Sequence, residues 1–297
     1  MSIVFEPQQL AFSEIYKPIK VLSLGAGQQS TALALMSVEN KLKKQMVHLA
    51  VPVYDAIIFC DLGAEAEWVY RQVDFVKTAC ELAGIPFYVL SEKNLIEDYL
   101  KDFGYKRVVA MPFWSIGEDG KKAKMRRNCT VDYKINVIQK FIRYHILGYK
   151  KGQRTREIDI GTHEMHLGFS YEETDRRFSS YNPLYVNKYP LVDMKLTRAD
   201  NYKYTREEWG LETKASACIM CPFHRNYFYY YLKHNDKNSF EQLVKFDNHI
   251  GEMQPKTPIR SKIFVSRSRK RICDLTEGEC NDAKYFTYNN KEIWNGF

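Results

Sequence analysis

The stretch Val21-Leu-Ser-Leu-Gly-Ala-Gly-Gln-Gln-Ser-Thr31 decides how the rest of this chain is understood. It starts inside an apolar segment, Ile19–Leu24, that predicts a β-strand, and it leads into the apolar pattern of a helix over residues 30–44. Between the two, Gly25 and Gly27 are expected to take positive φ values and to let the backbone come close to a ligand. The sequence therefore predicts a strand, a tight loop and a helix in direct succession.

This loop has the features of a phosphate site. Ser30 and Thr31 stand where a helix would be capped. The loop N–H groups and the helix N-terminus would point at one spot, which suits an anion. The loop has neither the Gly-Lys-Ser/Thr ending of a Walker loop nor the G-x-G-x-x-G pattern. A plain turn between strand and helix is the alternative interpretation.

The following residues repeat the alternation of strand and helix. Segments 56–60 and 86–90 are apolar, as in buried parallel strands, and residues 65–83 between them predict a helix that Gly84 ends. This order predicts an α/β fold with a doubly wound parallel sheet. Ligands bind beyond the carboxyl ends of such strands. We therefore expect Asp61-Leu-Gly63, which follows the second strand, to lie beside Gly25–Thr31. We call Gly25–Thr31 the phosphate loop after its expected role.

The middle of the chain mixes regular elements with one long loop. Residues 104–127 are interpreted as a basic loop that holds Phe113 and Trp114, a mixture suited to stack on a nucleotide or nucleic acid and to neutralise it; an ordered surface loop is the alternative. Regular elements are expected elsewhere: helices over 94–103, 131–147, 198–209 and 240–246, and a strand over 157–161.

The composition changes after Gly210, where a cysteine turn and the aromatic run Tyr227–Tyr231 begin a different kind of sequence. We therefore divide the chain into a nucleotide-binding α/β domain of residues 1–210 and a C-terminal extension of residues 211–297. The extension contains cysteines and basic and aromatic residues, and it is expected to pack on the first domain.

Charge and composition limit the class of protein. The net charge is +8, and the excess is concentrated in three runs, Lys121–Arg127, Lys150–Arg156 and Arg267–Arg271. Such runs bind nucleic acid or polyphosphate, or they form a solvated basic face. We expect no signal peptide and no membrane span. The odd count of seven cysteines suits reduced thiols, so a cytoplasmic protein is expected.

The cysteines suggest a metal site. Cys218-x-x-Cys221 has the spacing of half a zinc or iron–sulfur site. Cys129 lies just before a predicted helix, where the dipole favours a thiolate, and is a third candidate ligand. The fourth position is either open for substrate or sulfide, or it is filled by His224, Cys273 or Cys280. A redox pair or coincidence would also explain the spacing.

His163-Glu-Met-His166 is one residue short of the H-E-x-x-H zinc motif. For both histidines we favour a structural or substrate-contacting role over a metal. Acidic and basic residues that follow the predicted strand are expected to line the cleft: Glu164, Asp175, Arg176 and Arg177.

Leu22–Thr31 resembles the pyrophosphatase loop, S-G-G-x-D-S-T, of the adenine-nucleotide α-hydrolase-like enzymes, also called PP-loop enzymes. Aligned on Ser30, the family's serine falls on Gly25 and its aspartate on Gln29. Phe59-Cys-Asp-Leu-Gly63 is similar to the F-x-D-T-G segment of the same enzymes.

Two further segments resemble the phosphoadenosine phosphosulfate (PAPS) reductases. Cys129–Ile135 is similar to their C-C-x-x-R/Y-K-V segment, with Thr130 for the second cysteine, and Tyr189-Pro-Leu191 is similar to P-L-x-x-W, with Met194 for tryptophan. In the reductases the tandem cysteines and a later CxxC bind a [4Fe-4S] cluster. The resemblance covers residues 19–225 and is strongest to proteins of this family often found in phages and mobile elements.

The resemblance implies that the loop binds ATP and Mg²⁺ and that ATP is cut between its α- and β-phosphates. It also implies a [4Fe-4S] cluster, or Zn²⁺ as the alternative, on the cysteines. The implied catalytic residues are Ser30, Asp61, Lys134 and Arg176, and Arg126, Arg127 and Arg177 are further candidates to neutralise phosphates. The implied nucleotide-binding residues are Ser23, Gly25, Ala26, Gly27, Gln28, Gln29, Ser30, Thr31, Asp61 and Gly63.

We therefore expect an adenylating enzyme that modifies a nucleotide or a nucleic acid such as tRNA or DNA, with sulfur transfer as one option. A sulfur-donor protein and a second copy of the chain are the implied partners. One alternative is a PAPS reductase, although Glu279-Cys280 is followed by Asn281 where the reductases have glycine. Two more interpretations stay open: a nucleotide-sensing or nucleic-acid-binding protein, which Gln29 favours, and a zinc-containing amidating ligase.

Overall fold

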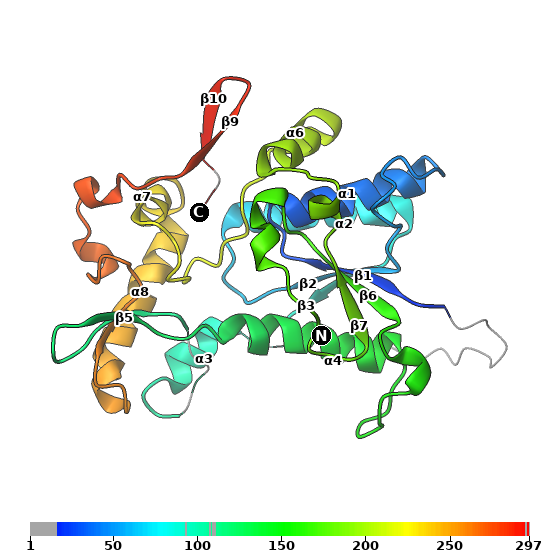
Figure 1. Cartoon of the computed structure of the whole chain (residues 1–297). Helices are drawn as coiled ribbons and strands as arrows, with labels where there is room; N and C mark the ends of the chain where they lie inside the picture. Colours follow the sequence, from blue (N-terminus) through cyan, green and yellow to red (C-terminus); the bar gives the residue numbers. More distant parts are fainter. Residues whose placement is uncertain (1–16, 93, 107, 109–110, 295, 297) are drawn as a thin grey trace.

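The computed structural model describes residues 17–92, 94–106, 108, 111–294 and 296. A five-stranded parallel sheet lies at its centre, in the order β3–β2–β1–β6–β7 (Figure 1). The predicted α/β class with a parallel sheet is confirmed. The strands are β1 Lys20–Leu24, β2 Ala56–Cys60, β3 Phe87–Leu90, β6 His163–Leu167 and β7 Tyr185–Lys188.

Helices cover both faces of this sheet, as Figure 1 shows. Successive strand residues point to opposite faces, so Leu22 belongs to the core under α1 and α2, and Val21 to the core over α4. Both side chains are fully buried, which explains why the strands are apolar throughout. The covering helices are α1 Gln28–Leu42, α2 Glu67–Ala83 and α4 Asn136–Phe141.

The order of the strands creates a switch point. From β1 the chain moves outward through β2 to β3, and it then returns to β6 and moves outward in the other direction to β7. The loops that leave β1 and β6 therefore diverge at the carboxyl edge of the sheet. Ligands of doubly wound folds bind in the crevice at such a point.

The predicted strand over 157–161 is wrong, because these residues form a 3₁₀ turn, Glu157–Asp159. The Asp159 carboxylate is buried and accepts hydrogen bonds from Tyr149 Oη and Arg156 Nε. Ile158 and Ile160, which made the segment resemble a strand, are more than half exposed. The strand begins only at His163.

Residues 104–127 are more ordered than the predicted loop, within the part that the structure describes. Two short strands, β4 Trp114–Ile116 and β5 Lys122–Lys124, form an antiparallel pair, and β4 also pairs with β8, Lys262–Phe264. Three-residue strands show no periodicity, and β5 has an exposed Lys-Ala-Lys sequence. Residues 107, 109 and 110 of this segment lie outside the described residues.

The expected helix over 131–147 is a helical run in which two π-helical turns, Val131–Ile135 and Ile142–Ile146, flank α4. The helix over 198–209 is present with the expected ends, and the remaining expected helices are present with shifted ends. The other elements are α3 Leu95–Asp102, η4 Tyr171–Arg176, α5 Pro190–Asp193, α6 Arg198–Trp209, α7 Asn226–Asn235, α8 Lys237–Met253, η7 Glu277–Cys280, β9 Tyr285–Tyr288 and β10 Lys291–Trp294.

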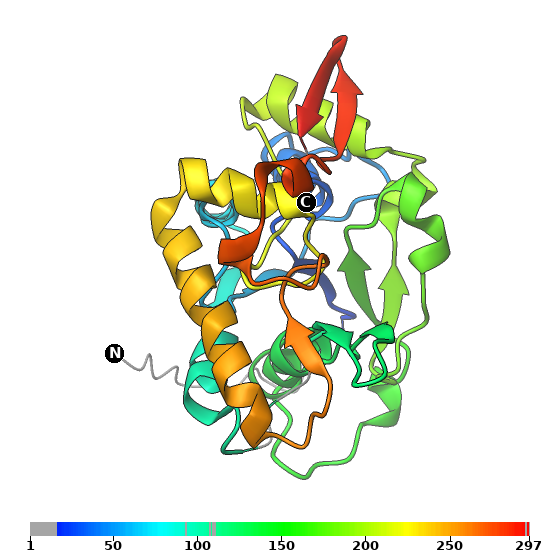
Figure 2. The same cartoon turned by 90° about the vertical axis from the view of Figure 1, so that its left-hand side faces the viewer.

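Residues after 210 share the core of the first domain. Phe228 of α7 and Phe246 of α8 belong to the same apolar cluster as α1 and α2. Figure 2 views the molecule from the side of α7, α8 and β8. The division into domains at residue 210 stays a prediction. Among the described helices, none is long and apolar enough to cross a membrane.

Candidate nucleotide and cysteine site

The phosphate loop differs from the expected geometry in two ways. Helix α1 begins at Gln28 with Gly27 as its N-cap, so Ser30 and Thr31 lie in the first turn and do not cap it. The positive φ belongs to Ala26, at 50°, and to neither glycine. Gly27 is needed for another reason: a Cβ there would lie 2.7 Å from Ser216 N. The loop therefore has another stretch of backbone directly against it.

A second backbone segment closes the opposite side. Gly168 follows β6 directly, and a Cβ on Gly168 would lie 2.6 Å from Ser30 N. Because β1 and β6 are neighbours, this contact lies at the switch point of the sheet. The start of α1 thus lies between Gly168 and Ser216. Glycine is needed at position 168 for the contact with Ser30 and at position 27 for the contact with Ser216.

The N-terminus of α1 is suited to bind an anion. The first N–H groups of a helix have no partner within the helix. Among the described residues, no side chain caps this end of α1, and its first turn contains no acidic residue. The helix runs for 15 residues, so its dipole places partial positive charge at the loop.

The polar side chains Gln28, Ser30 and Thr31 of the loop are buried. Gln28 and Thr31 are fully buried, and Gln28 Nε2 donates to Thr213 O at 3.1 Å, so both belong to the core. Ser30 is also buried, and its Oγ donates weakly to Gly27 O at 3.4 Å. Ser23 lies within β1, on the α4 side of the sheet. A ligand would therefore meet mainly the backbone of this loop.

Gln29 contacts a carboxylate that sequence reasoning missed. Gln29 Nε2 donates to Glu173 Oε2 at 3.0 Å, and Glu173 also forms an ion pair with Arg176. The short helix η4 holds both charged residues against the loop. Arg176 is thus near the loop as expected, but its charge is paired with Glu173.

Asp61 lies at the carboxyl end of β2, the strand beside β1. Its Oδ1 accepts hydrogen bonds from Gly63 N at 2.8 Å and from Tyr70 Oη at 3.0 Å. Gly63 has a φ of 77°, which glycine adopts without strain. This turn holds the Asp61 carboxylate at the edge of the sheet where the phosphate loop also lies.

An extended segment, residues 213–217, joins the loop to the cysteines. Gln72 Nε2 donates to Ala26 O at 2.5 Å, and Gln72 Oε1 accepts from Lys214 N at 2.6 Å. Ala66 N donates to Ala217 O at 2.7 Å. The signal that sequence reasoning missed is Gln72 itself, a buried amide on the apolar face of α2.

The cysteine turn continues from this segment. Cys221 N donates to Cys218 O at 3.0 Å, and Cys218 forms a backbone bridge with Glu65. Burial is the main reason that the pKa of the Cys221 thiol is raised to about 11, and the neighbouring Cys129 contributes in the same direction. The structure therefore brings Cys129 beside the Cys218–Cys221 turn.

These cysteines have the right donor chemistry for zinc or an iron–sulfur cluster. In the part of the chain that is described, however, no three Cys, His, Asp or Glu side chains are arranged as a complete metal site. His224 stacks on Phe228 with 3.6 Å between ring centroids, and its Nε2 hydrogen-bonds Cys218 O at 2.9 Å. Its ring is thus packed into the core beside the turn.

Lys134 lies beside Glu65 and the cysteine turn. The π-helical turn Val131–Ile135 places its Nζ 2.8 Å from Glu65 Oε1. Burial lowers the pKa of Lys134, but Glu65 outweighs burial and the pKa is raised overall. The Glu65 side chain is only 1% exposed, so a charged pair lies next to Cys218.

Both histidines of His163–His166 are buried within β6. His163 contacts Asp159 at 3.1 Å and His166 contacts Glu164 at 2.9 Å. Glu164 lies beside Lys20, at the amino end of the sheet. The expectation that Glu164 lines the cleft is therefore wrong, because the strand starts later than predicted.

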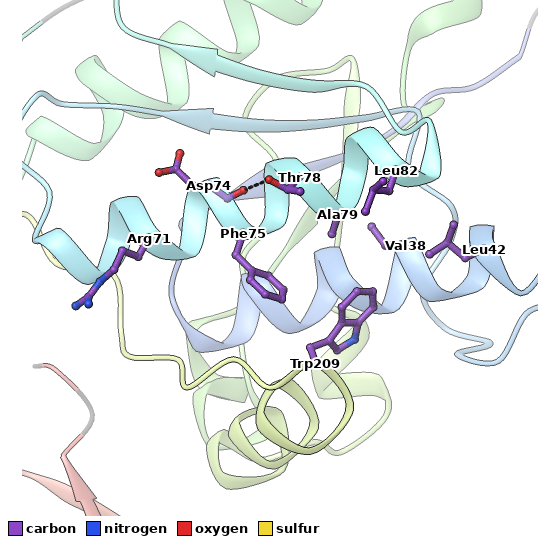
Figure 3. Close-up of a pocket in the computed structure, with 9 residues that line it drawn as sticks. All are labelled: Val38, Leu42, Arg71, Asp74, Phe75, Thr78, Ala79, Leu82 and Trp209. Atoms are coloured by element: carbon purple, nitrogen blue, oxygen red, sulfur yellow. Dashed lines mark hydrogen bonds between the residues drawn. The ribbon is translucent and has the colours of Figure 1, made fainter.

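Two hollows of the surface lie away from this edge. The first is a groove between α1, α2 and α6, lined by Val38, Phe75, Leu82 and Trp209 among others (Figure 3). Its volume is about 500 Å³. A smaller hollow of about 260 Å³ lies at the amino end of the sheet, beside Lys20 and Glu164. Neither includes a residue of the phosphate loop.

Comparisons with protein-family models, with curated proteins and with solved structures find no match to this chain.

Proposed function

We propose that this protein is an ATP-dependent enzyme that adenylates an oxygen of a nucleotide or nucleic acid and releases pyrophosphate. One observation carries the proposal: the uncapped N-terminus of α1 lies at the switch point of a parallel sheet, with the Asp61 carboxylate at the same edge. The resemblance of Leu22–Thr31 to a pyrophosphatase loop supports ATP as the ligand.

The proposed step balances without a redox partner. A substrate oxygen attacks the α-phosphorus, the bond from that phosphorus to the bridging oxygen breaks, and pyrophosphate leaves with the electron pair. The N–H groups of the first turn of α1 would stabilise the charge on the leaving group. Asp61 and Glu173 are the carboxylates that would hold Mg²⁺, which would neutralise phosphate charge.

The cysteines belong to a second step in this proposal. Cys129, Cys218 and Cys221 would hold a [4Fe-4S] cluster, with Zn²⁺ as the alternative, and a nucleophile such as sulfide would displace AMP. An absorption spectrum and elemental analysis of protein purified without oxygen distinguish the two metals.

The reductase alternative depends on Cys280 as a nucleophile. Cys280 is 5% exposed, burial raises the pKa of its thiol, and the neighbouring acidic groups Asp282 and Glu279 raise it further. This environment disfavours a thiolate. The structure therefore adds no support for sulfonucleotide reduction.

Pyrophosphate release tests the proposal. Purified protein is incubated with ATP, Mg²⁺ and pools of tRNA, single-stranded DNA or nucleotides, and pyrophosphate and AMP are measured. Asp61→Asn keeps the hydrogen-bonding oxygen but removes the charge, and we expect it to lower turnover by about 100-fold or more. Asp74→Asn is the matched control, because Asp74 is exposed on α2.

Two outcomes would overturn the proposal. ATP binding by calorimetry without pyrophosphate from any pool would favour the nucleotide sensor. Sulfite release from PAPS with thioredoxin, and no pyrophosphate from ATP, would favour the reductase.

A further inference from the structure

We infer that the small sheet β5–β4–β8 and the turn that carries Phe223 form a binding surface for a single-stranded nucleic acid. We call the residues Trp114, Lys122, Lys124, Arg127, Phe223 and Arg267 the aromatic–basic strip. The inference names the substrate class of the proposed enzyme and rests on that function for its biological role. The binding itself can be measured without catalysis.

The strip exists because two basic runs that are far apart in sequence meet in the fold. Strand β4 pairs with β5 from the first run and with β8, which immediately precedes the second. Arg269 reaches across both strands of the hairpin: its Nε donates to Ser115 O at 3.1 Å and its Nη2 to Ala123 O at 3.4 Å. The run Lys121–Arg127 and the run Arg267–Arg271 thus form one surface.

Cations surround the two aromatic rings of this surface. Lys124 lies 5.5 Å from the centre of the Trp114 ring, and Arg267 lies 5.8 Å from the same ring. Lys124 also lies 4.5 Å from the Phe223 ring, and Arg127 lies 5.3 Å from it. Trp114 Nε1 donates to Pro222 O at 2.6 Å, which joins the small sheet to the turn that carries Phe223.

The central charges of the strip are not neutralised within the protein. Among the described residues, no carboxylate lies within 4 Å of Lys122, Lys124 or Arg127, whereas Arg271 pairs with buried Asp247 at 2.9 Å. Arg267 has only a distant partner, Asp282, at 3.8 Å. The surface therefore keeps a positive charge that suits a polyanion.

The aromatic rings favour a single strand over a duplex. Trp114 and Phe223 are both partly exposed, and flat rings between cations let bases stack while the cations bind phosphates. In a duplex the base faces are already stacked on one another, so only the phosphates could bind. The strip also leads to the proposed site, because Phe223 is two residues from Cys221.

The third basic run provides a matched control. Residues 150–156 follow the other end of the α4 run, where Arg143 and Arg156 pack on the Tyr149 ring at 4.2 and 4.6 Å. Arg156 pairs with buried Asp159. Lys150 and Lys151 are exposed lysines outside the strip.

Fluorescence anisotropy with labelled single-stranded DNA and RNA of about 20 nucleotides tests the inference across a range of salt concentrations. We expect the double variant Lys122→Glu/Lys124→Glu to bind about tenfold more weakly or worse. Its slope of log K against log salt should fall by about 1.4, because each lost phosphate contact removes about 0.7. The control Lys150→Glu/Lys151→Glu should change neither by a comparable amount.

A second variant tests stacking. Phe223→Leu keeps an apolar side chain but removes the flat ring, and we expect single-strand binding to weaken about fivefold or more while heparin binding is unchanged. Circular dichroism confirms that each variant is folded. The inference is overturned if duplex of the same sequence binds as tightly as the single strand. It is also overturned if Phe223→Leu has no effect, since the surface would then attract any polyanion.

The two proposals fail separately. Asp61→Asn should lower pyrophosphate release by about 100-fold or more and leave oligonucleotide binding intact. Turnover on a nucleic acid with unchanged binding by the Lys122→Glu/Lys124→Glu variant would reject the strip and retain the enzyme. Specific binding by the strip without pyrophosphate release would do the reverse.

Discussion

At the scale of single residues, two glycines matter through what touches them. Gly27 and Gly168 have no positive φ, and each lies against backbone that leaves no space for a Cβ. The expectation that Gly25 and Gly27 take positive φ values is therefore wrong, because Ala26 takes the positive φ instead. The loop needs glycine because Ser216 and the first turn of α1 are so close.

A single methyl group tests this close contact. In Gly168→Ala the new Cβ would meet backbone atoms of Ser30, so the first turn of α1 must move. We expect a loss of about 1–3 kcal/mol in the free energy of unfolding and weaker ATP binding. Urea denaturation and calorimetry measure the two effects.

Gly278→Ala is the control for this change. A Cβ added at Gly278 would meet nothing within 4 Å, and the residue has no positive φ, so alanine there should be neutral or slightly stabilising. An equal loss of stability in both variants would show that close contact at Gly168 is not the cause.

At the scale of elements, the hairpin β9–β10 is attached to the segment that covers the phosphate loop. Lys214 Nζ lies 5.1 Å from the ring of Trp68, 4.7 Å from Tyr231 and 5.3 Å from Trp294. Lys214 also hydrogen-bonds Gln72, which in turn contacts Ala26 O. The last strand thus supports the loop through three aromatic rings and one lysine.

Removal of one ring should loosen this attachment. Trp294 packs on Tyr231 with 4.4 Å between ring centroids and is partly buried, so we expect Trp294→Ala to lower the free energy of unfolding by about 2 kcal/mol. Hydrogen exchange should become faster at residues 213–217. Tyr181→Ala, at a side chain 96% exposed, is the control, and equal protection in both variants would contradict the proposed support.

At the scale of the whole molecule, stability in acid depends on contacts between layers. Glu39 of α1 receives hydrogen bonds from Lys43, His48 and Tyr204, the last of which belongs to α6. Burial alone would raise the pKa of Glu39, but these bonds outweigh burial and lower the pKa to about 2. The carboxylate therefore stabilises the fold while it is ionised.

The stabilisation from the Glu39 carboxylate therefore depends on pH. The unfolded value is 4.5, so this contribution is complete above pH 4.5 and is lost as the pH falls toward about 2. Glu39→Gln should be less stable than the wild type at neutral pH, and the difference should shrink below pH 4.5. Urea denaturation from pH 7 to pH 3 measures it. Glu67→Gln, at a 63% exposed side chain, should show no such trend.

The sequence by itself determined the first half of the central sheet, strands β1, β2 and β3 with the helices between them, and the loop after β1. Residues 56–60 are apolar because β2 is buried on both faces, and Gly84 ends α2 in the left-handed conformation that its sequence position predicts. These features are local, since periodicity and end signals are properties of neighbouring residues. The position of Asp61 beside the phosphate loop followed from the parallel arrangement.

Only the tertiary structure decided the rest. The His163–Leu167 strand has a polar sequence, and its histidines can be buried because they contact partners such as Asp159. Strand β5 forms only by pairing with β4. Gln29 contacts Glu173, and Arg269 of one basic run contacts Ala123 of another; each contact joins residues more than 100 positions apart in the sequence. Such contacts leave no periodic pattern in the sequence, because each depends on a partner that only the folded chain brings near.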